Sequence, residues 1–233
     1  MPNPVESVTV SVGYADYLAL SLEFNAHLFS KSVVVTDFND HETPKVCARY
    51  PTVQCVKTDK FYREGASFCK SSGLNAGLDF LKPEGWVATW DADIALSQQI
   101  ANVALSCLGT LHTSYIYGPL HKVHIQRNVL GSNLHMGGKA CAGFFQLFYA
   151  PYLKLKGLSY PVVSGDCSYD DVLFSQRFNG VCYLPTAGFH LGPSMDDGIP
   201  NVNWKGRVSP PCPLTRDEVS KAIKQFEAGL FPA

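Results

Sequence analysis

The spacing of apolar residues in the first 90 positions alternates between the period of a strand and that of a helix. Val8 and Val10 alternate with polar residues, and Leu18 and Leu22 follow at helical spacing after Asp16, a candidate N-cap. The predicted strands cover residues 5–12, 32–37, 53–56 and 86–90, and the predicted helices cover residues 16–29, 43–49 and 67–81. This alternation predicts an α/β fold with a parallel sheet covered on both faces.

The pattern is less regular in the second half, where residues 118–143 show little periodicity and residues 193–213 are rich in proline and glycine. Thr215 and Glu218 match a capping box. The predicted helices cover residues 94–108, 149–158, 168–178 and 215–228, and the predicted strands cover residues 113–117, 144–148 and 181–184. No repeat and no clear boundary interrupts the chain, which predicts a single domain over residues 1–233.

Composition excludes several classes of protein. Of the 233 residues, 46% are hydrophobic and 17% are charged, as in an ordinary globular domain, and the net charge of −1 gives no global reason to expect nucleic acid. No apolar run approaches the roughly 20 residues that span a bilayer. The eight cysteines include no C-x-x-C pair, and no secretory signal precedes them, which predicts reduced thiols in a cytoplasmic protein.

The strand predicted over residues 86–90 ends in Asp91-Ala92-Asp93. Side chains at positions i and i+2 of a strand share a face, so we expect the two carboxylates to point together beyond the strand end. Carboxylate oxygens suit Mg²⁺ or Mn²⁺, which proteins commonly share with substrate phosphates. The alternative is a turn in which the aspartates accept backbone hydrogen bonds.

Four sequence features occur in an order that points to one family. They are the strand and turn Val8–Tyr14, Asp37 at the end of the second strand, the segment Lys70–Leu78 (KSSGLNAGL), and Asp91-Ala92-Asp93. This set resembles the nucleotide-sugar glycosyltransferases of the GT-A fold and is similar to the family 2 inverting enzymes. The resemblance implies a Rossmann-like, mostly parallel central sheet flanked by helices, with a smaller mixed-sheet half.

The resemblance also assigns roles to residues. Residues 1–93 would bind the nucleotide sugar and residues 94–233 the acceptor. Asp93 would coordinate Mn²⁺ or Mg²⁺ directly, while Asp91 would contact the ribose, or the metal through water. His190 would be a further metal ligand, with a packed strand-end histidine as the alternative. The implied donor contacts are Val12, Tyr14, Asp37, Lys70, Asn75 and Asp91, with Lys205 and Arg207 on the diphosphate or, alternatively, in a solvated loop.

Asp170 and Asp171 open the helix predicted over residues 168–178. By resemblance, Asp171 is the catalytic base and Asp170 orients the acceptor, because an inverting transfer needs one carboxylate to take the proton of the attacking hydroxyl. We expect the helix N-terminus to lower the pKa of Asp171. The alternative is that both acids only complement the helix dipole. Tyr169 stands where the family usually has glycine, which leaves the acceptor geometry in question.

Residues 112–142 carry cations and histidines but no acidic residue. They include Lys122, Arg127, Lys139, His112, His121, His124 and His135. We expect a basic wall of the acceptor groove, which suits an anionic acceptor such as a phosphorylated glycan or nucleic acid. A zinc site built on His121 and His124 and an ordinary loop are the alternatives.

The predicted function is a metal-dependent inverting glycosyltransferase. It moves a sugar from a nucleotide sugar, expected to be a UDP-sugar, to a hydroxyl of a glycan or of a hydroxymethylated DNA base. One alternative is a nucleotidyltransferase that makes nucleotide sugars, although the turn Gly13–Asp16 lacks the lysine or arginine that such enzymes need. The other is a non-catalytic module that binds a sugar or nucleotide.

Overall fold

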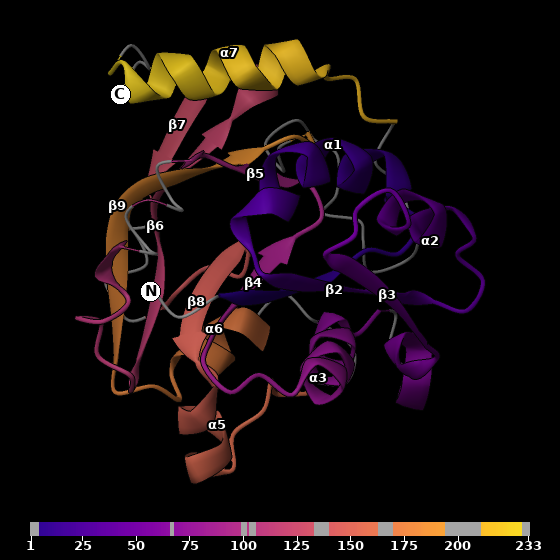
Figure 1. The fold of residues 1–233 in the computed structure, drawn as a ribbon, viewed down its shortest axis with the longest axis vertical. Helices are drawn as coiled ribbons and strands as arrows, with labels where there is room; N and C mark the ends of the chain where they lie inside the picture. The colour runs from indigo at the N-terminus through magenta and orange to yellow at the C-terminus, as the bar shows by residue number, and fades with distance from the viewer. Residues whose placement is uncertain are drawn as a thin grey trace.

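The computed structural model describes residues 5–65, 68–98, 102, 106–132, 140–162, 170–193 and 211–229. The strands are β1 (Glu6–Val10), β2 (Lys31–Asp37), β3 (Val53–Thr58), β4 (Trp86–Asp91), β5 (Ile94–Leu96), β6 (Tyr115–His124), β7 (Val129–Ser132), β8 (Phe145–Tyr149) and β9 (Gly180–His190). Within the described residues they form one sheet in the order β3-β2-β1-β4-β8-β6-β9-β5, with β7 paired to β6. Figure 1 shows that this sheet curls, because β6, β7 and β9 run steeply across the direction of β2 and β3.

The two halves of the sheet differ in strand direction. β3, β2, β1 and β4 are parallel to their neighbours. β8 is antiparallel to both β4 and β6, β9 is parallel to β6, and β5 is antiparallel to β9. Val33, Val34 and Val35 in β2 are fully buried, because helices cover both faces of the parallel half. The α/β class and the mixed second half are therefore as predicted.

Helices form a layer on each side of the sheet (Figure 1). They are α1 (Ala15–Asn25), α2 (Glu42–Cys47), α3 (Lys70–Leu81), α5 (Ala150–Lys156), α6 (Asp170–Ser175) and α7 (Arg216–Glu227), with the 3₁₀ turns η1 (Ala26–Leu28), η2 (Lys60–Gly65) and η3 (Ile125–Arg127). Residues of α1, α2 and α7 enter one hydrophobic core, and residues of α3, α5 and α6 enter the other. Two separate cores give the molecule three layers.

The glycines of the Lys70–Leu78 segment fix how closely α3 packs on the sheet. A Cβ at Gly77 would lie 2.9 Å from Val35 Cγ2 and closer still to Val8, and one at Gly73 would lie 2.8 Å from Val10 Cγ2. These distances are shorter than van der Waals contact, so only glycine allows this approach. The close packing brings Lys70, at the start of α3, to the end of β4.

Three predictions about the elements are wrong. Residues 94–96 form β5 rather than the start of a helix, because they pair with β9. β6 and β9 extend beyond their predicted ranges, to His124 and His190, and β7 lies in the stretch without periodicity, because strand pairing imposes structure that the local pattern does not show. Tyr14, not Asp16, is the N-cap of α1, and Asp16 accepts a hydrogen bond from Cys212 N instead.

Other predictions are confirmed. Thr215 and Glu218 form the capping box of α7. The seven cysteines in the described ranges are free thiols. None of the helices that the structure describes is both long enough and apolar enough to cross a bilayer.

Candidate functional site

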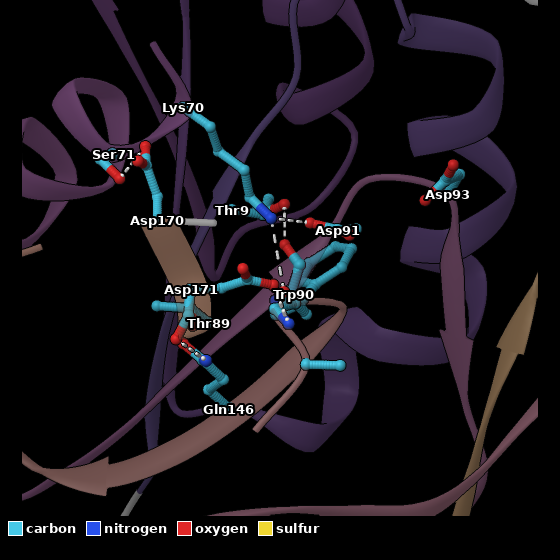
Figure 2. A network of polar contacts seen from close by, with 12 residues as sticks. Thr9, Lys70, Ser71, Thr89, Trp90, Asp91, Asp93, Gln146, Asp170 and Asp171 are labelled. Atoms are coloured by element: carbon cyan, nitrogen blue, oxygen red, sulfur yellow. Dashed lines mark hydrogen bonds and ion pairs between the residues drawn. The ribbon is translucent and has the colours of Figure 1, made fainter. Parts of the chain in front are cut away.

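The candidate site lies where the chain changes direction across the sheet. From β1 the chain moves outward through β2 and β3 and then returns to β4 on the other side of β1. Ligands of open α/β sheets bind beyond the carboxyl ends of the strands at such a switch point. Asp91 ends β4 there, opposite Val10 of β1, and forms an ion pair with Lys70. Figure 2 shows this pair at the centre of a polar network.

Asp93 has a different partner. The chain turns after Asp91, so the two carboxylates do not share one strand face as predicted. Asp93 Oδ2 lies 3.3 Å from His190 Nε2 at the end of β9, and both side chains are mostly buried. Burial raises the pKa of Asp93, but the charge and hydrogen bond of His190 outweigh this and lower the pKa to about 2. Figure 2 shows Asp93 set apart from the Lys70–Asp91 pair.

The surroundings of Asp93 fit a divalent ion in part. A Cβ at Gly192 would lie 3.3 Å from Asp93 Oδ2 and 3.3 Å from His190 Cε1, so glycine keeps the space beside both side chains open. One carboxylate and one imidazole are two of the donors that Mn²⁺ accepts, and Mg²⁺ or Mn²⁺ commonly takes its remaining ligands from water and phosphate. No group of three or more possible protein ligands occurs among the described residues. A metal held by Asp93 and His190 alone would take its other ligands from a reactant or from water.

Asp170 and Asp171 lie at the start of α6 but face different groups. Asp171 Oδ2 accepts a hydrogen bond from Gly143 N, and its Oδ1 accepts one from Val172 N at 2.9 Å. Asp170 accepts a hydrogen bond from Ser71 Oγ at 2.5 Å and is almost fully buried. In Figure 2, Asp171 extends toward the Lys70–Asp91 pair while Asp170 turns toward Ser71.

The structure changes the expected pKa of the acidic pair. Burial raises the pKa of Asp171, and this effect outweighs the opposing charge of Lys70 and the hydrogen bond from Gly143. Burial also raises the pKa of Asp170, and the neighbouring Asp171 raises it further. The expectation that the helix N-terminus lowers the pKa of Asp171 is therefore wrong, because desolvation dominates.

Asn75 makes contacts within the protein. Its side-chain amide donates to Tyr160 O at 3.0 Å and accepts from Tyr160 N at 2.9 Å. The Tyr160 hydroxyl donates to Gln146 Oε1 at 2.7 Å, and Gln146 Nε2 donates to Asp171 O at 3.2 Å. This buried chain of hydrogen bonds links α3 to the backbone of Asp171. Asn75 thus holds the framework of the site, and the sequence did not indicate Tyr160 or Gln146.

The residues expected at the nucleotide lie at the ends of β1 and β2. Asp37 is mostly buried and accepts a hydrogen bond from Asn39 N at 2.8 Å. Tyr14 is 6% exposed and packs on Tyr17, with ring centroids 5.5 Å apart, and Val12 packs against the core under α3. Tyr14 therefore presents little surface to a ligand.

Asp40 is a carboxylate near the ends of β1 and β2 that the sequence analysis did not single out. It accepts hydrogen bonds from Gly13 N at 2.9 Å, Thr36 Oγ1 at 2.9 Å, and both the backbone N (3.0 Å) and the hydroxyl (2.7 Å) of Thr43. Burial alone would raise the pKa of Asp40, but these hydrogen bonds lower it. Asp40 thus fixes the turn after β1 against the start of α2. Its position three residues after Asp37, before a short helix, was the only available signal.

The remaining predicted residues differ in what the structure says of them. Lys205, Arg207, Lys139 and His135 lie outside the described residues. The His121 and His124 rings point to different partners, with His121 5.9 Å from Phe226 and His124 5.1 Å from His190 between ring centroids, so the zinc alternative built on this pair is not supported. Lys122 lies at the candidate site, near Asp91 and Asp93, with its Nζ over the Phe144 ring.

The fold is GT-A-like and of Rossmann type. The mannosyltransferase PcManGT from Pyrobaculum calidifontis, solved with GDP-Man and Mn²⁺, matches with a TM-score of 0.58 and 15% identity over 86% of this chain and 58% of that one. Glucosyl-3-phosphoglycerate synthase from Mycobacterium tuberculosis, solved with Mg²⁺ and UDP, matches with a TM-score of 0.56 and 10% identity over 84% of this chain and 74% of that one.

A structure of 4-diphosphocytidyl-2C-methyl-D-erythritol synthase also matches, with a TM-score of 0.50 and 14% identity over 78% of this chain and 89% of that one. No protein-family model and no curated protein matches the sequence. At these identities the similarity establishes the fold alone, and the chain spans 58% of the mannosyltransferase's length.

Proposed function

We propose that this protein is a metal-dependent inverting glycosyltransferase that uses a nucleotide sugar, with a UDP-sugar as the expected donor. The observation that carries the proposal is that Lys70, Asp91 and Asp171 lie together at the switch point between β1 and β4, with the Asp93–His190 pair nearby. Carboxylates for a divalent ion and a buried carboxylate of raised pKa are the two requirements of this chemistry. Structures of the same fold were solved with GDP-Man or UDP and a divalent ion.

In this mechanism Asp93 and His190 would hold Mn²⁺ or Mg²⁺, and the ion would supply positive charge to offset the negative charge of the leaving diphosphate. Lys70 lies beside Asp91 and can pair with a phosphate oxygen once the donor enters. Asp91 is then free to accept a hydrogen bond from a hydroxyl of the donor. Lys205 and Arg207 are proposed to contact the diphosphate.

Asp171 is the proposed base. Its carboxylate reaches the cluster from α6 and takes the proton of the acceptor hydroxyl as that oxygen attacks the anomeric carbon. A raised pKa makes the carboxylate a stronger base, which favours proton transfer. Asp170, held by Ser71, is proposed to position the start of α6 and the acceptor beside it. Asn75, through Tyr160 and Gln146, supports the backbone of Asp171.

Nucleotidyl transfer is the second candidate because 4-diphosphocytidyl-2C-methyl-D-erythritol synthase has a similar fold. Two observations argue against nucleotidyl transfer. The turn Gly13–Asp16 contains no lysine or arginine, and Gly13 N donates a hydrogen bond to the carboxylate of Asp40. A negative side chain behind the turn is unfavourable for a triphosphate at that place.

A thermal-shift screen of nucleotide sugars with Mn²⁺ tests the proposal, because a ligand raises the melting temperature by mass action. We expect a UDP-sugar to stabilise the protein only when the metal is present and to be hydrolysed slowly. Stabilisation by CTP or UTP alone, with release of pyrophosphate when a sugar phosphate is added, would instead support nucleotidyl transfer. Binding with no turnover of any donor would indicate a non-catalytic module.

A further inference from the structure

Lys122 is a cation within the candidate site that the proposed mechanism does not use. Side chains alternate along β6, so Lys122 and His124 lie on one face of the strand. His124 lies beside His190, with ring centroids 5.1 Å apart, and His190 contacts Asp93. The face of β6 that carries Lys122 is therefore the face that lies beside His190 and Asp93.

An aromatic ring fixes the direction of the lysine. Lys122 Nζ lies 5.3 Å from the centroid of the Phe144 ring. That ring rests on Gly188, which is the β9 partner of Lys122, because a Cβ at Gly188 would lie 2.8 Å from Phe144 Cε2. Phe144 follows Gly143, whose backbone N donates to Asp171 and whose backbone O accepts from Lys70. The Lys122 ammonium is thus held above the Phe144 ring, near the carboxylate cluster of Asp91, Asp93 and Asp171.

The charges around Lys122 leave it available for an anion. Asp91 and Asp93 already have Lys70 and His190 as direct partners. Burial lowers the pKa of Lys122, while Asp93 and Asp91 raise it and Lys70 lowers it further, with a net decrease. A cation that is costly to desolvate gains most from an added negative charge.

We propose that Lys122 is an anion-binding residue of the candidate site, whose ammonium contacts a phosphate oxygen of the bound reactant beside Asp93. The inference rests on the proposed function for the identity of that reactant. With Asp91, Asp93 and Asp171 ionised and His190 neutral, as a metal-ligating histidine must be, Lys70 and Lys122 leave these residues with one net negative charge, and a divalent ion changes this to one net positive charge. Lys122 therefore opposes binding of the metal alone and favours binding of the metal together with a phosphate.

The test compares Lys122→Gln with wild type, with Lys122→Arg as the rescue variant and Lys154→Gln, an exposed lysine of α5, as the matched control. Calorimetric titration with Mn²⁺ alone should give tighter binding in Lys122→Gln. Titration with pyrophosphate at saturating Mn²⁺ should give affinity about 10-fold to 100-fold weaker, as expected for loss of one charge-assisted hydrogen bond. Lys122→Arg should recover most of this loss, and Lys154→Gln should match wild type.

Two further titrations identify the source of the phosphate. If UDP with Mn²⁺ loses affinity in Lys122→Gln, the phosphate belongs to the donor. If UDP binds as in wild type but inorganic phosphate, added at saturating UDP and Mn²⁺, binds more weakly, the phosphate belongs to the acceptor. Unchanged affinity for pyrophosphate, UDP and inorganic phosphate in a folded Lys122→Gln variant would overturn the proposal.

The same titrations separate this inference from the proposed function. If wild type binds pyrophosphate without binding Mn²⁺, the metal-dependent mechanism fails, yet a loss of pyrophosphate affinity in Lys122→Gln still supports the anion site. A far-ultraviolet circular dichroism melt of each variant shows whether it is folded. Should Lys122→Gln unfold, the isosteric Lys122→Met provides the same comparison.

Discussion

Replacing Gly143 by alanine should displace the Asp171 side chain and also lower the stability of the protein, and the two effects can be measured separately. A Cβ at Gly143 would lie 2.6 Å from Asp171 Cβ and 2.8 Å from Asp171 Cγ. Contacts between carbon atoms are ordinarily about 3.5–4.0 Å, so the Asp171 side chain must move by roughly 1 Å. The move also breaks the hydrogen bond from Gly143 N, a bond to a charged group that contributes about 1.5–3 kcal/mol.

Two measurable effects follow from this displacement. Overpacking in a closed site costs about 1–3 kcal/mol of unfolding free energy, which a denaturant titration detects. A misplacement of about 1 Å in a reacting group lowers the catalytic rate on the order of 10²-fold. The rate is that of hydrolysis of the nucleotide sugar found by the thermal-shift screen, with water standing in for the acceptor, at saturating donor and Mn²⁺.

Gly85→Ala is the matched control, because nothing lies within 4 Å of a Cβ at that position. It should keep the rate and leave the stability unchanged or slightly higher. A Gly143→Ala variant that loses stability but hydrolyses donor at the wild-type rate would refute the role of Asp171 as base. Wild-type stability and rate together would refute the packing argument itself.

Four other outcomes are expected. Asp93→Ala should abolish Mn²⁺ binding and donor turnover, and full activity of the wild type in excess EDTA would contradict this. Asp171→Asn should bind donor normally but transfer sugar about 10² to 10⁴ times more slowly, and NMR of the wild-type product should show an inverted anomeric centre. Because the pKa of Asp171 is raised, the turnover rate should fall as the pH decreases through a value above the ordinary aspartate pKa of about 3.9. A turnover rate that stays unchanged down to pH 4 would contradict the assignment of Asp171 as the base. Because the pKa of Asp40 is lowered, wild type should be more stable than Asp40→Asn above about pH 4 and lose this advantage as the pH falls through the lowered pKa, which urea melts across this range measure.

The parallel half of the fold could be predicted because its signals are local. Buried parallel strands need continuous β-branched residues, such as those of β2, and the helices between them need one apolar face. The strands and helices of the first 91 residues were found in this way, with errors at their ends. The capping box of α7 is equally local, since Thr215 and Glu218 are three residues apart.

The antiparallel half depends on pairing between distant segments. β5 is three residues long and is a strand only because β9, more than 90 residues later, pairs with it. The ends of β6 and β9 support each other in the same way. Such pairs have no local pattern, so residues 94–96 and 118–132 could not be assigned from the sequence.

For the candidate site, the sequence indicated which carboxylates to expect there, and the tertiary structure decided what each one faces. The order of Lys70, Asp91, Asp93 and Asp171 along the chain was enough to indicate metal and phosphate chemistry. Only the fold separates Asp91, which pairs with Lys70, from Asp93, which pairs with His190. Burial, more than any other effect, raises the pKa of Asp171, and strand alternation turns Lys122 toward these carboxylates. The local sequence shows neither, because desolvation and side-chain direction depend on neighbours that the chain brings together when it folds.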